Sequence, residues 1–317
     1  MLNQNYPNAF LFKIISKCND SCDFCLEYEF IKANRPCLTF SEFKNNYEYL
    51  KKRFNPEYII LTGGEPTLHS DFLRMLKFLK ERGDGFRFIT NLLRFGDYKF
   101  VEQVREIFSD FNDLKQKKLS KIIASINDLP SKDRISEQRY EGLKNLFKAR
   151  LPLVISVLIY KGNLEHLANL SGILKDLIEK DKTKRSFHVE FRLMYIEGVL
   201  DELLKISLPT DYRKLKLTVE KCIDILHTPR IKATLWNFPL CYIDNYAKAK
   251  NDSIPERQAR RLIKIHKDGQ LDKFEVRDWE QYLKSRNECK VCALKKYCSG
   301  VDPIYIDKYG FPDLKRF

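Results

Sequence analysis

The sequence lacks the features that would assign the protein to a membrane or to the secretory pathway. No apolar run approaches the roughly eighteen residues that a membrane-spanning helix needs. The N-terminal stretch MLNQNYPNAFLFKIISK has no basic region and no small-residue cleavage site, so we expect no signal peptide. No low-complexity linker divides the chain. These absences predict a cytoplasmic protein with no membrane partner.

Histidine is also scarce. The five histidines are scattered along the chain, so a histidine-based metal site is not indicated. We interpret His69 as structural or solvated rather than as a ligand.

What is present is ordinary for a globular protein. The 317 residues are 44% hydrophobic and 32% charged, which is enough for one large α/β core or for a barrel with a small appendage. The net charge of +14 favours an acidic partner, such as a carboxylate-rich peptide, a nucleotide or RNA. A lysine-rich solvated surface explains the same charge equally well.

Predicted strands and helices alternate along most of the chain. The strands read as near-continuous apolar runs, as strands buried on both faces do, and the connections are short. We therefore predict an α/β fold: a partial (β/α)6 barrel of the TIM type with a small cysteine-rich C-terminal extension. In such barrels the functional groups lie at the carboxyl ends of the strands. The six strand–helix pairs are 10–16 with 39–54, 57–62 with 71–82, 86–90 with 98–111, 121–126 with 137–150, 153–160 with 164–180 and 187–196 with 212–226.

Two local signals mark helix ends. Thr39 or Ser41 is the expected cap of the first helix, because an acid lies close behind each. Gly83 is expected to end the second.

The pattern changes near residue 228. An extended segment over 231–240 leads to Cys241, and a highly charged stretch follows over 247–277. We therefore divide the chain into a barrel over 1–228 and an extension over 229–317. The extension is too short for a second domain with its own core, so a metal-stapled appendage is expected.

The nine cysteines fall largely into tight groups. In a chain without an export signal, such groups favour metal binding over disulfides. Cys18, Cys22 and Cys25 directly follow the first predicted strand. Each thiolate can hold one iron of a [4Fe–4S] cubane, which leaves the fourth iron open to a small molecule. Zinc is the alternative and would need a fourth ligand, for which Cys37 is a candidate.

A second motif, Gly63-Gly64-Glu65-Pro66, ends the second predicted strand. Two glycines let the backbone approach a ligand closely, and the acid can accept hydrogen bonds from an ammonium group. Taken alone, the segment is also a Gly-Gly turn before an acid and a proline that start a helix.

Together the two motifs resemble those of the radical SAM superfamily. The signature of that family has three cysteines at this spacing with an aromatic residue before the last, which is Phe24 here. The resemblance covers most of the first 200 residues. It implies that Cys18, Cys22 and Cys25 hold a [4Fe–4S] cluster and that the Gly63–Pro66 segment binds the methionyl amino group of S-adenosylmethionine (SAM).

Weaker matches follow the later strands. These are Thr90-Asn91, Ser125-Ile126-Asn127-Asp128 and Lys161-Gly162-Asn163. The resemblance assigns SAM contacts to polar residues at these strand ends, although each could equally be turn chemistry. The candidate cofactor-binding residues are Phe24, Gly63, Gly64, Glu65, Pro66, Asn91, Ser125, Asn127 and Asn163.

The resemblance also implies a reaction. Enzymes of this family use one electron from the cluster to cleave SAM reductively into methionine and a 5′-deoxyadenosyl radical, which abstracts a hydrogen atom from the substrate. An electron donor such as flavodoxin or ferredoxin is an implied partner.

The C-terminal cysteines resemble a second feature of that family. Cys289, Cys292 and Cys298 have the spacing of the SPASM and Twitch extensions, and Cys241 is the natural fourth thiolate. The four imply one auxiliary [4Fe–4S] cluster, with zinc as the alternative. A full SPASM domain has a further cysteine where Asp302 stands here, so a Twitch-like arrangement with one cluster is the better match.

Two cysteines remain. Some family members use a free cysteine as a hydrogen-atom donor, so Cys37 and Cys222 are candidate catalytic residues. For Cys222, which lies on a predicted helix, a small buried core residue is the favoured interpretation.

The substrate is inferred by family analogy alone. SPASM and Twitch enzymes often modify ribosomally synthesised peptides by crosslinking, epimerisation or related steps, so a peptide is our leading hypothesis. Only seventeen residues precede Cys18, so we expect a separate peptide-recognition protein or direct binding by the barrel. The alternatives are a small molecule, such as a nucleotide, sugar or cofactor precursor, and a non-catalytic zinc protein that binds nucleic acid.

Overall fold

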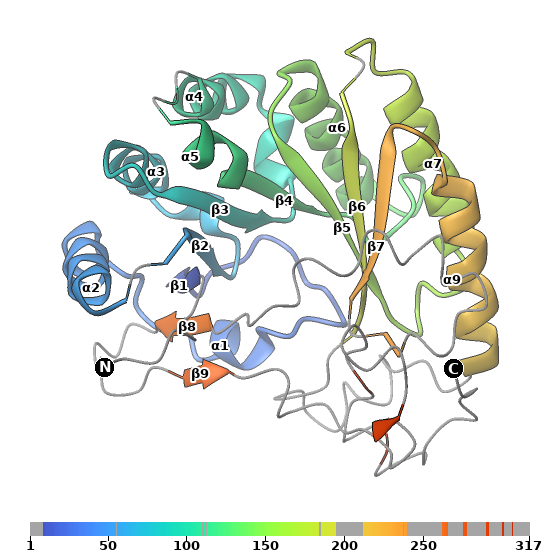
Figure 1. Ribbon diagram of the computed structural model, residues 1–317, viewed down its shortest axis with the longest axis horizontal. Helices are drawn as coiled ribbons and strands as arrows, with labels where there is room; N and C mark the ends of the chain where they lie inside the picture. The colour runs from blue at the N-terminus through green and yellow to red at the C-terminus, as the bar shows by residue number, and fades with distance from the viewer. Residues whose placement is uncertain are drawn as a thin grey trace.

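A computed structural model of the chain describes residues 9–54, 56–109, 111, 113–183, 185–194, 212–236, 238–239, 262–265, 275–277, 290–291, 300 and 306. Seven parallel strands form a curved, open sheet, and the connecting helices lie along its outer face (Figure 1). The predicted partial-barrel fold is confirmed. The strands are β1 (Ala9–Ile15), β2 (Tyr58–Gly63), β3 (Gly85–Thr90), β4 (Lys121–Ser125), β5 (Leu153–Ile159), β6 (Phe187–Leu193) and β7 (Ile231–Trp236).

The sheet order follows the chain order, so each strand pairs in parallel with the one before it. The expected extended segment over 231–240 contains β7, which pairs in parallel with β6. Two short strands of the charged 247–277 stretch extend the other edge. Of these, β8 (Leu262–Ile265) pairs in parallel with β1, and β9 (Glu275–Arg277) pairs antiparallel with β8.

The helices have the ends that the sequence signals predict. Thr39 caps α2 through a capping box with Glu42, and Gly83, at φ +76°, follows the end of α3. No helix in the described ranges is both long and apolar enough to span a bilayer. The helices are α1 (Tyr28–Lys32), α2 (Phe40–Arg53), α3 (Phe72–Glu81), α4 (Tyr98–Phe108), α5 (Leu114–Leu119), α6 (Arg134–Lys148), α7 (Leu167–Glu179) and α9 (Tyr212–Leu226), with short 3-10 helices η1 (Pro66–Leu68) and η2 (Leu93–Gly96).

Alternate residues of each strand face opposite sides of the sheet. On β1, Phe10, Phe12 and Ile14 are buried beneath the helices in the main core. On the inner face, Leu11 packs against a smaller cluster that includes Tyr58 and Ile60. Because all seven strands are parallel, their carboxyl ends meet at one edge, and the loops there are the place to look for a site.

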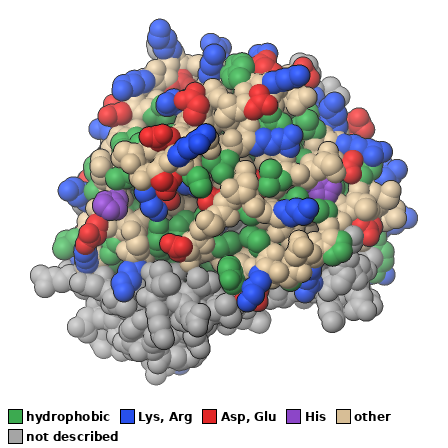
Figure 2. Space-filling model, turned by 180° about the vertical axis from the view of Figure 1, so that it is seen from behind, with side chains coloured by type: hydrophobic (Ala, Val, Ile, Leu, Met, Phe, Trp, Pro, Cys, Tyr) green, Lys and Arg blue, Asp and Glu red, His purple; other side chains and the backbone are tan. Residues whose placement is uncertain are grey.

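The charged side chains are dispersed. Figure 2 shows Lys and Arg spread over one face of the molecule among Asp and Glu, rather than gathered in one patch. On that face the basic surplus has the distribution of a solvated surface.

Candidate active site

The loop over residues 16–27, which we name the cysteine loop, joins β1 to α1 at the carboxyl edge of the sheet. It carries Cys18, Cys22 and Cys25, all partly buried. A turn brings the last two together, because the Cys25 amide donates to the Cys22 carbonyl oxygen at 3.1 Å. At its far end Glu27 forms an ion pair with Lys13 of β1, which folds the loop back over its own strand.

Backbone hydrogen bonds join the end of β2 to the start of this loop. The Gly64 amide donates to the Ile15 carbonyl oxygen at 2.7 Å, and the Glu65 amide donates to that of Lys17 at 2.8 Å. A Cβ at Gly64 would lie 2.1 Å from the Lys17 carbonyl oxygen. Gly63 has a φ of +134°, and a Cβ there would lie 2.1 Å from the Ile15 carbonyl oxygen. The close approach that requires both glycines is therefore an approach to the cysteine loop itself.

The Glu65 side chain lies beneath the loops at 2% exposure. Its carboxylate accepts hydrogen bonds from the Thr67 amide at 3.1 Å, the Thr67 hydroxyl at 2.6 Å and the Thr90 hydroxyl at 2.9 Å. It also accepts one from the Asn91 amide at 2.7 Å. Burial raises the pKa of Glu65, and these hydrogen bonds oppose the rise. The carboxylate thus joins the ends of β2 and β3.

Asn91 reaches from the end of β3 to the cysteine loop. Its side-chain amide donates to the Asn19 Oδ1 at 2.8 Å and lies 3.9 Å from the Cys18 Sγ. Its Oδ1 accepts from the Leu93 amide at 3.1 Å. The side chain is therefore held beside the first cysteine.

The ends of β4 and β5 are joined by two asparagines. Asn127 accepts from the Leu158 amide at 2.8 Å, and Asn163 donates to the Asn127 carbonyl oxygen at 3.1 Å. Asn163 also accepts from the Tyr160 amide at 3.1 Å. Ser125, the last residue of β4, is partly exposed. Both asparagines thus hold the strand ends together.

Aromatic and ionic contacts tie the cysteine loop to this same region. The Phe24 ring packs on that of Tyr160 with centroids 4.3 Å apart. Arg139 of α6 forms ion pairs with Asp20 in the loop and with Asp128 after β4. Sequence reasoning missed Arg139, because nothing in its local sequence distinguishes it from other basic residues on helices.

Comparison with known proteins identifies the family of the chain. The sequence model of the radical SAM superfamily matches residues 12–171, about half of the chain. The protein belongs to the radical SAM superfamily. It is therefore a SAM-dependent enzyme, and the cofactors that the family implies are SAM and a SAM-binding [4Fe–4S] cluster.

Solved structures share its fold at low sequence identity. Streptococcus suis SuiB bound to S-adenosylmethionine is 14% identical with a TM-score of 0.63, over 99% of this chain and 77% of that one. SuiB bound to its precursor peptide SuiA is 14% identical with a TM-score of 0.62, over 99% and 75%. The structure described as native anSMEcpe with bound AdoMet and Cp18Cys peptide is 14% identical with a TM-score of 0.62, over 98% and 93%. No curated protein matches the sequence.

The donor set of this radical SAM enzyme fits a cluster, because thiolates are soft ligands that suit iron–sulfur centres. Burial raises the pKa of all three loop thiols, to about 11 at Cys25, and the Asp20 carboxylate adds to the rise at Cys22. The thiolates therefore need a positive centre to form. Among the described residues, no three His, Cys, Asp or Glu side chains converge on one ion position. Ligands of a cubane bind different iron atoms and need not converge.

A polar set on the inner face of β6 and β7 was also missed. Because Val189 and Phe191 belong to the core beneath the helices, the alternate residues His188, Glu190 and Arg192 face the inside of the sheet. Arg192 donates to Glu190 at 2.9 Å through Nε. The period-two alternation of FHVEFRL could have revealed this face. On β7, Thr234 lies 2.8 Å from the His188 Nε2, and the Trp236 ring lies 5.1 Å from the Arg192 guanidinium.

The two candidate catalytic cysteines, Cys37 and Cys222, are not part of the cysteine loop. Cys222 is fully buried in the main core on α9, where burial raises the pKa of its thiol to about 11. Cys37 is partly buried before α2 and packs against the same core. The four predicted auxiliary ligands, Cys241, Cys289, Cys292 and Cys298, lie outside the described residues, as does Asp302.

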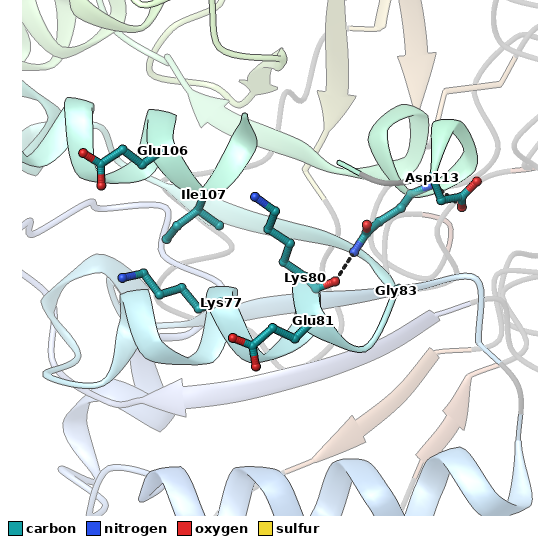
Figure 3. A pocket seen from close by; sticks show the side chains of 8 residues that line it. Lys77, Lys80, Glu81, Gly83, Glu106, Ile107 and Asp113 are labelled. Atoms are coloured by element: carbon teal, nitrogen blue, oxygen red, sulfur yellow. Dashed lines mark hydrogen bonds between the residues drawn. The ribbon is translucent and has the colours of Figure 1, made fainter. Parts of the chain in front are cut away.

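A cavity of about 490 Å³ lies far from the cysteine loop (Figure 3). It is bounded by the ends of α3 and α4 and the start of α5, beside the amino ends of the strands. There Lys80 accepts a 2.8 Å hydrogen bond from the Gln116 side chain through its carbonyl oxygen. No residue of the carboxyl edge lines this cavity. Its lining is Lys77, Lys80, Glu81, Gly83, Glu106, Ile107, Asp113 and Gln116.

Proposed function

We propose that Cys18, Cys22 and Cys25 bind the [4Fe–4S] cluster of this radical SAM enzyme. When bound, the cluster and SAM supply a 5′-deoxyadenosyl radical that abstracts a hydrogen atom from the substrate. The observation that carries the proposal is the pair of backbone hydrogen bonds that Gly64 and Glu65, at the end of β2, donate to Ile15 and Lys17 at the start of the cysteine loop. The chain that carries them belongs to this family.

The chain's own residues would shape the SAM site in two ways. Asn127 and Asn163 would hold strand ends in register, because their side chains form hydrogen bonds with neighbouring backbone groups. Glu65 would accept hydrogen bonds from the methionyl ammonium group of SAM, and it would also hold the Asn91 amide at the end of β3. Asn91 and Ser125 lie at the partly exposed surface of the same edge and would contact SAM. The backbone of Gly63, Gly64 and Pro66 and the ring of Phe24 would line the remaining wall.

Iron and sulfide counting after anaerobic purification tests the cluster. We expect about four irons per chain from the cysteine loop and about four more from an auxiliary cluster. A C18A/C22A/C25A variant should lose the first four and all reductive SAM cleavage to 5′-deoxyadenosine, whereas C37A should keep both. Zinc in place of iron in the purified wild-type protein would refute the proposal.

We also propose that the predicted 229–317 extension is Twitch-like beyond β7, the strand that joins the barrel sheet, and that Cys241, Cys289, Cys292 and Cys298 hold one auxiliary [4Fe–4S] cluster there. Its support is the spacing of these cysteines. A C289A/C292A variant should retain SAM cleavage and lose about four irons. A variant that keeps its full iron content, or that loses zinc instead, would exclude the auxiliary cluster.

For the substrate we propose a ribosomally synthesised peptide. Support comes from the fold shared with SuiB, solved with the precursor peptide SuiA, and with anSMEcpe, solved with the Cp18Cys peptide. Incubation with short peptides encoded beside this gene, followed by mass spectrometry, tests it. A mass change that requires SAM and reductant supports the proposal.

A small molecule, such as a nucleotide, sugar or cofactor precursor, is the second candidate, and the partly exposed Arg192 guanidinium, paired with Glu190 on the inner face of β6, gives it a polar binding group. Cofactor-biosynthesis genes as neighbours, with no short open reading frame, would favour this candidate over the peptide.

A further inference from the structure

One arginine joins three of the strand-end loops. The Arg139 side chain, on α6, is only 6% exposed. Its guanidinium donates to the Asp20 carboxylate in the cysteine loop and to the Asn91 carbonyl oxygen after β3 at 3.2 Å. It also lies 3.5 Å from the Asp128 carboxylate after β4. A single side chain therefore contacts the loops that follow β1, β3 and β4.

A second chain of contacts connects the cysteine loop to Asp128 through Phe24 and Tyr160. The Phe24 ring packs on Tyr160, and the Tyr160 hydroxyl donates to the Asp128 Oδ1 at 3.3 Å. Lys132 lies 2.8 Å from the same oxygen. Asp20 and Phe24 stand two residues before and two residues after Cys22. The contacts of Asp20 and Phe24 therefore lie on either side of Cys22 in the sequence, and both lead to Asp128, through Arg139 and through Tyr160.

Stability alone is a poor explanation for this ion triad. Asp20 and Asp128 are 9% and 13% exposed, and at such burial the desolvation of the charges offsets much of their attraction. A guanidinium fixes the directions of its hydrogen bonds, because its N–H groups lie in one plane at fixed angles. Three loops bonded to one planar group are held in one relative arrangement.

We propose that Arg139 is a positioning residue: it fastens the cysteine loop to the ends of β3 and β4 so that Cys22 is placed for cluster binding, and its charge eases reduction of the cluster. This inference rests on the proposed cluster at Cys18, Cys22 and Cys25. A cluster gains one negative charge when it is reduced. Loss of Arg139 would remove the cation that pairs with Asp20, while Asp128 would keep its ion pair with Lys132. Reduction would then become harder.

The experiment compares R139M, R139K and R185M after anaerobic reconstitution with iron and sulfide. Arg185 is a matched control. It also forms an ion pair with a buried acid, Asp181, at 3.4 Å, and it lies beside the amino end of β6, away from the cysteine loop. Three quantities are measured: iron per chain, the midpoint potential of the EPR signal that changes when SAM is added, and the Tm of the apoprotein.

We expect R139M to lose at least half of the SAM-responsive signal and to shift the potential of the remainder to more negative values. R139K should load more iron than R139M and less than the wild type, because lysine keeps the positive charge but lacks the planar set of N–H donors. R185M should lower the apoprotein Tm to a comparable extent and leave both loading and potential at wild-type values.

Two results would overturn the inference. If R139M keeps wild-type loading and potential and loses only Tm, as R185M does, then Arg139 merely stabilises α6. If loading and potential are kept but the response to SAM disappears, Arg139 acts on SAM rather than on the loop.

Should R139M fail to fold, D20N weakens the same link from the loop side, and it should lower iron loading while its apoprotein Tm falls no further than that of R185M. Wild-type protein without iron would instead refute the proposed function, and this is seen before any variant is made.

Discussion

The Glu65 carboxylate accepts a 2.7 Å hydrogen bond from the Asn91 amide, and this bond ties the end of β2 to the end of β3. On its other side Asn91 reaches Asn19 and Cys18 in the cysteine loop. The acid that the sequence predicts to bind the SAM ammonium group is therefore also a buried acceptor that holds Asn91 beside the cysteine loop.

Glu65→Ala should destabilise the apoprotein markedly. It removes the acceptor of four hydrogen bonds in a buried site, and each stranded donor costs about 1–3 kcal/mol, so a loss of roughly 3 kcal/mol or more is expected. Urea unfolding measures it. Glu81→Ala, at an exposed position on α3, is the control and should change little. Equal stability of the two variants would show that the Glu65 hydrogen bonds contribute nothing.

Gly64→Ala should displace the cysteine loop. The added Cβ would lie 2.1 Å from the Lys17 carbonyl oxygen, a distance that forces the backbone apart. The control is Gly172→Ala on α7, where nothing lies within 4 Å of the new Cβ. It should stabilise the protein by roughly 0.5–1 kcal/mol, because alanine is the better helix residue. Thermal unfolding of the two apoproteins should therefore shift in opposite directions, and iron loading should fall only in Gly64→Ala.

His69 should make stability depend on pH. Its Nε2 lies 2.8 Å from the Leu38 carbonyl oxygen, and its Nδ1 accepts from the Asp71 amide at 3.0 Å, so both ring nitrogens are used by the neutral form. Burial lowers the pKa of His69, although the Leu38 contact and the Asp71 charge oppose the shift.

The folded state therefore binds this proton less readily than the unfolded chain. The stabilisation that neutral His69 contributes is fully present above the pKa of about 6.5 that histidine has in the unfolded chain. It is lost as the pH falls below that value toward the lower pKa of His69 in the folded state. The unfolding free energy should decline over that interval in wild-type protein and less steeply in His69→Gln. Identical pH dependence of the unfolding free energy in the two proteins would show that His69 does not contribute to it.

Cys222→Ala tests the buried thiol. Removal of a small core side chain should cost about 1 kcal/mol and leave 5′-deoxyadenosine formation unchanged. Cys37→Ala is the companion variant. If either variant forms 5′-deoxyadenosine normally but no longer completes the product, that cysteine is the hydrogen-atom donor.

Local pattern was enough for most of the fold. The apolar runs of the strands, the capping box at Thr39 and the glycine after α3 are short-range signals, and each is found where predicted. The position of β7 was harder to foresee, because an apolar run does not say which edge of a sheet it joins. Its pairing with β6 depends on the whole sheet being in place.

The sequence by itself predicted the chemistry of the site, because the cysteine spacing and the Gly-Gly-Glu-Pro run are contiguous motifs that can be recognised locally. It also determined the order of strands and helices. Only the tertiary structure decided which residues hold the site together. Asp20 and Arg139 are 119 positions apart, and Glu65 and Asn91 are 26 apart. They meet because parallel strands bring their carboxyl ends to one edge, a contact that depends on register and strand order rather than on any neighbouring residue.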